Sequence, residues 1–408
     1  MSMLHSRAVK PRISPWNGTE APSQIDRLQD ISGDWKANKE KQYEIGRDGI
    51  LGYKKNTPGF SCSAKQFEYG SMDFWRALAN VSAPASAALD NSIDLDDIKS
   101  TKFDISASLT DDDNIFKGTV LFPKLRINGF SINIGDPEAI VERNFDFVGE
   151  DYKILDGNYY AYETATIGAP GDGTVTLSPV PVEYAAGKYI FKVLRVRSGA
   201  VSELEEDALA GINTWKYDNG TKIVTVKTCL ATDVLKVYYE SATAYATLWT
   251  NNDSDPDFLR ASACDIFIKV GLSTKVYQLQ SVGIDVKFDR TDYREIGDDE
   301  VTLTGTKSKT VTIALDRYST DFALEDILAG DTTYPYINPR DFSDNIQLMI
   351  KIYEDSTKTT FKMGYLMKNI SPQGINTAQA TEDYNKRNTS LETDELLMSN
   401  DENEIVFS

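Results

Sequence analysis

The sequence has a single histidine, His5, among 408 residues, and this scarcity excludes most catalytic machinery. Catalytic triads and histidine-based acid–base catalysis need a histidine at the reacting centre. The three cysteines, Cys62, Cys229 and Cys264, are far apart and form no CxxC pair, so neither a zinc site nor a disulfide framework is predicted. The chain also has no phosphate-binding glycine loop. We therefore expect a protein that is not an enzyme and that needs no cofactor or metal.

Long apolar runs and basic residues are also scarce. No stretch reaches the roughly 18 apolar residues that a membrane-spanning helix requires, and the N-terminus has no apolar leader. The 43 Lys and Arg residues face 62 Asp and Glu residues, which gives a net charge of −19. Such a surface repels phosphate groups, so tight binding of nucleic acid is not expected. We predict synthesis in a reducing cytoplasm and no membrane partner.

What the sequence does contain is an internal repeat. Residues 28–46 and 279–297, aligned without a gap, share seven identities, whereas chance gives about one. Shorter matches follow in the same order along both segments. They are Phe116-Lys117 with Phe361-Lys362, residues 131–133 with 374–376, and Arg143-Asn144 with Arg387-Asn388. We infer one domain written twice, with another segment between the copies.

Each copy is predicted to contain a short amphipathic helix after its second strand. Ser71 or Asp73 is the expected cap of the first helix, and Ser319 or Thr320 that of the second, with Gly330 as its stop. Two bulky neighbours on the first helix cannot both face one core, so one of them needs cover from another subunit. The candidate subunit interface comprises the helix faces at Phe74, Trp75, Phe322 and Leu324.

The whole chain is predicted to be mainly β, in five segments. Each repeat is expected to be a β domain with a short helix, and the insert a smaller all-β module of sandwich type with a hairpin turn at Asp218-Asn219-Gly220. The acidic tail is expected to be solvated or docked on a neighbour. The segments are an N-terminal arm at 1–23, repeat A at 24–151, the inserted module at 152–260, repeat B at 261–397 and the acidic tail at 398–408.

The Asp-rich stretches at 94–97, 110–113 and 253–257 offer oxygen ligands of the kind that calcium prefers. They lack the fixed spacing and the terminal bidentate glutamate of a dedicated calcium site. We interpret them as polar loops, and the stretch 81–100 as a low-complexity loop. Most aromatic residues alternate with polar ones along predicted strands, which is the pattern of a core and not of a carbohydrate-stacking surface.

Three stretches of repeat A resemble the tail tube (major tail) proteins of tailed bacteriophages. They are YEIGRDGI at 43–50, FEYGSMDFWRALA at 67–79 and LRINGFSINIGDPEAIVERNFDFVGED at 125–151. The resemblance covers most of repeat A and, more faintly, repeat B. It implies a twisted β-sandwich with a flanking helix, and an immunoglobulin-like added module.

The resemblance also implies a function, which is self-assembly into stacked rings with a continuous inner β-barrel. Viral DNA would pass through the lumen without specific binding, and other tail proteins would be the remaining partners. The protein would be made in the host cytoplasm and located in the virion tail. A chain with two tube domains would close a ring with three copies, and six copies are the alternative. Two other functions stay open: a tail-tip adhesion protein whose β module binds a glycan, and a carboxylate-dependent hydrolase.

Overall fold

A computed structural model describes most of the chain. The described residues are 11–15, 22–36, 39–42, 52–55, 59–81, 92–149, 152–207, 213–244, 257–271, 273–277, 279–293, 303–318, 323–329, 342–343, 345–378 and 386–408. The protein is mainly β, as predicted, with several sheets and few helices. Among the described residues no helix is long and apolar enough to cross a membrane.

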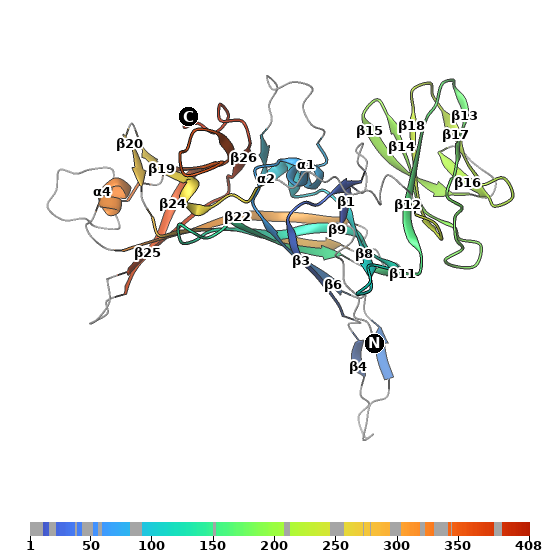
Figure 1. The fold of residues 1–408 in the computed structure, drawn as a ribbon, viewed down its shortest axis with the longest axis horizontal. Helices are drawn as coiled ribbons and strands as arrows, with labels where there is room; N and C mark the ends of the chain where they lie inside the picture. Colours follow the sequence, from blue (N-terminus) through green and yellow to red (C-terminus); the bar gives the residue numbers. More distant parts are fainter. Residues whose placement is uncertain are drawn as a thin grey trace.

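One antiparallel sheet runs through both repeats and is seen in Figure 1 as an arch. Its polar residues alternate with apolar ones, so that one face is buried and the other is exposed. The described helices that pack on the sheet lie on its convex side (Figure 1). In spatial order the strands are β3 (Leu28–Lys36), β6 (Gly59–Phe67), β10 (Glu142–Gly149), β9 (Phe116–Ile134), β21 (Ser281–Tyr293), β22 (Leu303–Tyr318), β25 (Lys386–Thr393) and β24 (Phe361–Ala378).

A smaller sheet covers the convex side of each half of the arch. In repeat A its order is β2 (Ser23–Gln24), β1 (Arg12–Pro15), β8 (Phe103–Thr110), the first part of β9, and β11 (Lys153–Asp156). In repeat B its order is β20 (Ser273–Tyr277), β19 (Cys264–Val270), β23 (Ile346–Tyr353), the first part of β24, β26 (Leu397–Ser399) and β7 (Ile93–Asp94). A hairpin of β4 (Lys39–Gln42) and β5 (Gly52–Lys55) stands apart.

The long strands β9 and β24 each belong to two sheets, and they bend at matching places. The bend falls at Lys124 in β9 and at Asn369 in β24, where φ is 52° and 51°. Beyond the bend each strand has a bulge. In β9 it lies between Ile127 and Gly129, and in β24 between Pro372 and Gly374. β9 is one continuous strand through Pro123 and Lys124. The Lys124 amide donates to Asp104 Oδ1 at 3.0 Å, which holds the bend.

The two predicted helices are present, as α1 (Asp73–Ala79) and α4 (Ala323–Ala329). Met72 occupies the N-cap position of α1, and the Ser71 hydroxyl accepts the Asp73 amide at 3.1 Å. The expected caps of α4, residues 319 and 320, and its stop at residue 330 lie outside the described residues. One apolar core joins the faces of both repeats, and α1 and α4 each contribute to it.

The inserted module forms its own seven-stranded arrangement beside repeat A (Figure 1). A separate apolar cluster fills it. It is anchored by the Lys192 ammonium, which donates to Asp104 Oδ2 at 2.6 Å with both side chains buried. Its strands in spatial order are β12 (Tyr159–Thr166), β18 (Val234–Ser241), β14 (Ile190–Arg197), β15 (Ala200–Glu206), β16 (Thr214–Asp218), β17 (Ile223–Cys229) and β13 (Gly171–Thr176).

Three expectations about irregular segments were wrong. Within the N-terminal arm, β1 pairs with β8, so its described part belongs to the fold of repeat A. Residues 92–98, placed in a low-complexity loop, form β7 and the helical turn α2 (Leu95–Ile98), which Asp94 caps through its carboxylate. The C-terminal tail is not wholly solvated, because Ile405 is fully buried against repeat B, while Glu402, Asn403 and Val406 are exposed. A buried apolar side chain every few residues was enough to fix each segment.

Candidate functional site: the open edges of the sheet

The junction between the repeats is a pair of hydrogen-bonded strands. β9 of repeat A pairs with β21 of repeat B, with Ile132 opposite Ile284 and Phe130 opposite Val286. All four side chains are buried. Where this pairing stops, the Arg290 guanidinium donates to the carbonyl oxygen of Ile127 at 3.0 Å. The sheet therefore passes from one repeat to the other without a break.

A buried polar cluster seals the convex side of this junction. The Glu68 carboxylate lies 3.2 Å from Arg143 Nη1, and both side chains are fully buried. The Tyr365 hydroxyl of repeat B donates to the same carboxylate at 2.5 Å. Burial raises the pKa of Tyr365 well above its usual value, so this hydroxyl remains a donor. Burial has the largest single effect on Arg143 and lowers its pKa, but Glu68, Tyr365 and Tyr69 together outweigh burial, so the pKa of Arg143 is raised.

Two further contacts cross the junction. The Lys309 ammonium of repeat B lies 2.9 Å from the Asp96 carboxylate of repeat A. β7 of repeat A adds itself to the edge of β26 in repeat B, with Ile93 opposite Met398. Met398 is fully buried as a result. The junction thus combines main-chain pairing, apolar cover and ion pairs, as stable interfaces do.

The arch ends in two open edges. At one end, β25 is the one strand that pairs with β24 over residues 371–378 in the described part of the chain, and Ile375 there is half-buried while Asn376 is exposed. At the other end, β3 pairs with no strand but β6 among the described residues, and Ser32 and Asp34 are exposed. The main chain of an edge strand can add to the sheet of another chain.

The two open edges are the counterparts of the two strands that form the internal junction. β24 takes the position in repeat B that β9 takes in repeat A, next to β25 and β10 respectively. β3 takes the position of β21, since each pairs with the second strand of its repeat. The arch therefore ends in β24, the counterpart of β9, at one end and in β3, the counterpart of β21, at the other.

A third edge shows the same contrast. β11 of repeat A corresponds to β26 of repeat B, because both pair with the first part of the shared long strand. Ile154 of β11 is 62% exposed, whereas the corresponding Met398 of β26 is 0% exposed under β7. An apolar side chain that is covered at the internal junction is uncovered at the open end.

The predicted interface residues lie elsewhere. Phe74 and Trp75 on α1, and Leu324 on α4, are all buried in the core of this chain. The expectation that Phe74 and Trp75 cannot share a core was wrong, because Phe145 packs against both rings, at centroid distances of 4.8 Å and 5.3 Å. Phe322 lies outside the described residues. The helix faces therefore leave no apolar surface that needs a partner at Phe74, Trp75 or Leu324.

The concave face of the arch is polar and acidic. Its side chains are those that alternate with the buried positions of each strand. Lys65 lies 2.8 Å from Glu142, and Lys287 lies 2.9 Å from Asp285, an ion pair that raises the pKa of Lys287. The described acidic residues of this face include Asp30, Asp34, Glu142, Asp146, Asp285, Asp289, Asp316 and Glu392, and the basic ones include Lys65, Arg126, Lys287 and Lys386.

The Asp-rich stretches have structural tasks where the structure describes them. Asp111 accepts the amides of Asp113 and Ile115 at 3.1 Å and 2.8 Å, which closes the turn between β8 and β9. Within the described ranges no group of three or more His, Cys, Asp or Glu residues is placed to hold a metal ion. Most of the stretch at 253–257 lies outside those ranges.

Sequence reasoning missed the open edges, although the signal was present. The repeat aligned 28–46 with 279–297, which are the segments of β3 and β21. Only the pairing of β21 with β9 makes β3 recognisable as an edge without its partner. No protein-family model matches this sequence, and a search of curated proteins finds no match either.

Proposed function

We propose that this protein is a structural subunit that assembles with copies of itself into closed rings, as the tube protein of a phage tail. The observation that carries the proposal is the continuity of the sheet across β9 and β21, with the counterpart edges left open at both ends. An edge of each kind on every copy allows head-to-tail pairing, which closes a ring if the rotation is right.

The internal junction fixes the register that such pairing would have. Gly283 lies opposite Asn133 and Asp285 opposite Ser131. Carried over to the open edges by the strand correspondence, Ser32 of one copy would lie opposite Ala378 of the next, and Asp34 opposite Asn376. The chain-to-chain junction would then repeat the internal one, with hydrogen bonds along both backbones.

Three copies are the proposed number. Each copy contributes eight strands to the arch, and strand number and tilt together set the diameter of a closed barrel. If a ring of this kind contains six tube domains, a chain with two repeats needs only three copies. Repeats A and B would alternate around the axis, and the concave face would line the lumen.

The acidic concave face suits a conduit for DNA. Phosphate groups are repelled by carboxylates, so the nucleic acid would slide along such a wall and not adhere to it. The inserted module lies beside repeat A and away from the concave face, so it would decorate the outside of the tube (Figure 1). Other tail proteins would contact the ends of the stack.

Native mass spectrometry and negative-stain microscopy of the purified protein test the proposal. We expect rings or tubes, and a ring mass of three chains of 45.4 kDa each. A ring of six chains would overturn the threefold model and keep the tube assignment. A protein that stays monomeric under all conditions that favour assembly would overturn both.

A variant of the open edge tests the pairing itself. Ile375 corresponds to Phe130, which is buried opposite Val286 at the internal junction. Ile375→Asp places a charge at the proposed chain-to-chain junction, and we expect loss of rings with an unchanged circular dichroism spectrum. Leu230→Asp is the matched control, because Leu230 is 48% exposed on the inserted module. Rings formed equally well by Ile375→Asp would show that β24 is not the contact.

A further inference from the structure

One contact at the internal junction comes from the segment that leads into repeat B. The Leu259 amide donates to the carbonyl oxygen of Glu68 at 2.9 Å, and the Val141 amide donates to the carbonyl oxygen of Leu259 at 3.0 Å. Leu259 is 2% exposed. Beside it, the Phe258 ring packs edge-on against Phe67 with 5.3 Å between centroids. This segment thus ties repeat B to the strand ends of repeat A.

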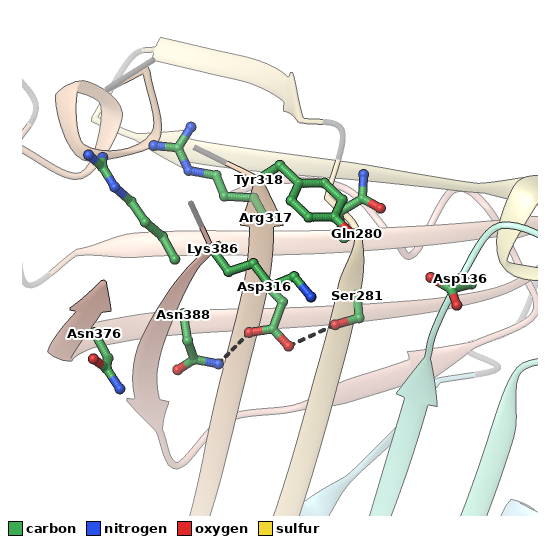
Figure 2. Close-up of a pocket in the computed structure, with 10 residues that line it drawn as sticks. Asp136, Gln280, Ser281, Asp316, Arg317, Tyr318, Asn376, Lys386 and Asn388 are labelled. Carbon is green, nitrogen blue, oxygen red and sulfur yellow. Dashed lines mark hydrogen bonds between the residues drawn. The ribbon is translucent and has the colours of Figure 1, made fainter. Parts of the chain in front are cut away.

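The same place in repeat B is an open cavity of about 300 Å³ (Figure 2). The strand registers match the two places, because Phe67 lies opposite Glu142 and Tyr318 lies opposite Lys386. Tyr318 therefore corresponds to Phe67, and its ring is 39% exposed. Polar side chains form the floor, where Asp316 accepts hydrogen bonds from Ser281 at 2.9 Å and Asn388 at 2.5 Å.

The segment that corresponds to residues 258–260 can be identified from strand register. β1 pairs with β8 as β19 pairs with β23, with Pro15 opposite Phe103 and Val270 opposite Ile346. Those two partners begin their strands, so Pro15 corresponds to Val270. Counting back from both without a gap aligns residues 3–5 with residues 258–260, and Leu4 with Leu259.

We propose that residues 3–5 of a neighbouring copy bind in the cavity at Tyr318, with Leu4 in the role of Leu259. The inference rests on the proposed ring. Residues 258–260 belong to the downstream repeat and bind the upstream one, so the arm of repeat A binds the repeat upstream of it. In a ring that repeat is repeat B of the next copy. Met3 packs on the exposed ring of Tyr318, as Phe258 packs on Phe67.

The arm would act as a clasp at each chain-to-chain junction. At the internal junction this task falls to a covalently continuous linker, whereas between chains the same contact must form on association. The arm adds buried apolar area to the main-chain pairing of β3 and β24, and apolar burial is the main source of association energy. Rings without the clasp would form only at higher protein concentration.

A cross-linking experiment tests the arm directly. Met3→Cys is combined with Tyr318→Cys in a protein whose half-buried Cys264 is replaced by Ser, and assembled rings are treated with a short thiol cross-linker. We expect covalent species of two and three chains on a denaturing gel. Neither single-cysteine variant gives them, and neither does Met3→Cys with Lys216→Cys, since Lys216 is an exposed residue of the module.

The outcomes separate the two proposals. Rings that form without the Met3–Tyr318 cross-link overturn the arm inference and leave the ring intact. A protein that never assembles overturns both. As a second measurement, Leu4→Asp should raise the concentration for half-assembly by about tenfold or more, because the corresponding Leu259 is buried in an apolar cluster at the internal junction and a carboxylate cannot replace that contact. Ser2→Asp is its matched control, since the corresponding Asp257 is exposed, and an equal effect of both variants contradicts the assigned register.

Discussion

Repeats A and B place the same strands in the same order but surround their buried arginines differently. Arg143 of repeat A lies opposite Gln66, and Arg387 of repeat B lies opposite Arg317. The third residue of the adjacent helix is Trp75 in repeat A and Glu325 in repeat B. Where the strands supply two arginines, the helix supplies a carboxylate. Where the strands supply one arginine, the helix supplies an aromatic ring. The Cζ atom of Arg143 lies 5.5 Å from the centroid of the Trp75 ring.

The two repeats share their backbone pairing but differ in the side chains around the arginines. We infer that the backbone pairing determines the architecture and that different sets of side chains are compatible with it. Both repeats keep the same bend and the same bulge in their long strands. Each arginine has a carboxylate close by. Arg143 forms an ion pair with Glu68, and Arg387 and Arg317 both form ion pairs with Glu325. The cluster in repeat A is closed by Tyr365 from repeat B. The cluster in repeat B borders the open cavity, and the Arg387 side chain is 12% exposed.

The largest expected effect comes from removing the carboxylate of the closed cluster. Glu68→Gln leaves the fully buried Arg143 without a counter-ion, which costs about 3–5 kcal/mol of unfolding free energy. Glu325→Gln removes the counter-ion of both Arg317 and Arg387, but we expect a smaller loss because both arginines border the open cavity. Denaturant unfolding measures both, and Glu205→Gln on the exposed face of β15 is the control. Equal losses for Glu68→Gln and Glu325→Gln would break the distinction between a closed and an open cluster.

An exchange of core residues between the repeats should have a smaller effect. Phe147 lies opposite Cys62, and Leu391 lies at the corresponding position opposite Ile313. Leu391→Phe adds volume to a filled aliphatic core and should destabilise repeat B by about 1–3 kcal/mol. Phe147→Leu should cost about 1–2 kcal/mol through the cavity it leaves. Thermal unfolding measures both, and a stabilising Leu391→Phe would mean that the core of repeat B is not close-packed.

The smallest effect is expected at the exposed ion pairs across the junction. Hydrogen bonds from Lys99 and then Lys309 lower the pKa of Asp96 below its ordinary value of 3.8. A carboxylate with a lowered pKa in the folded state stabilises the fold at pH values above its ordinary pKa. This stabilisation is lost as the pH falls through the lowered pKa. Asp96→Asn should therefore cost less than about 1 kcal/mol at neutral pH. The difference from the wild type should shrink towards zero below pH 3.8, and a difference that grows in acid would contradict this account.

The helices and most turns were predictable from the sequence, whereas the continuity of the long strand β9 was not. Helices at 73–79 and 323–329 followed from short amphipathic patterns, and the turn at 111–115 from its cluster of aspartates. The single strand β9 was not predictable, because Pro123 in its middle indicates the end of a strand. The strand remains continuous through the bend, where β8 pairs on both sides of it and the Lys124 amide donates to Asp104, twenty residues away in the chain.

The candidate site shows the same division between local and distant information. Hydrophobic patterning correctly placed Phe74, Trp75 and Leu324 on helices but gave no account of what covers them. A helical period defines a face, whereas cover depends on strands such as β10 that are distant in sequence. Phe145 of that strand covers both aromatic residues, and no local pattern links it to α1.

By itself the sequence determined a mainly β chain with a repeated pattern, an acidic surface and a separate module, because composition and periodicity are local properties. The tertiary structure alone decided that β21 would pair with β9, and hence that β3 and the end of β24 would remain open. Backbone amides and carbonyls are the same in every residue, so the choice of strand partner is set by the packing of distant side chains such as Ile132 on Ile284.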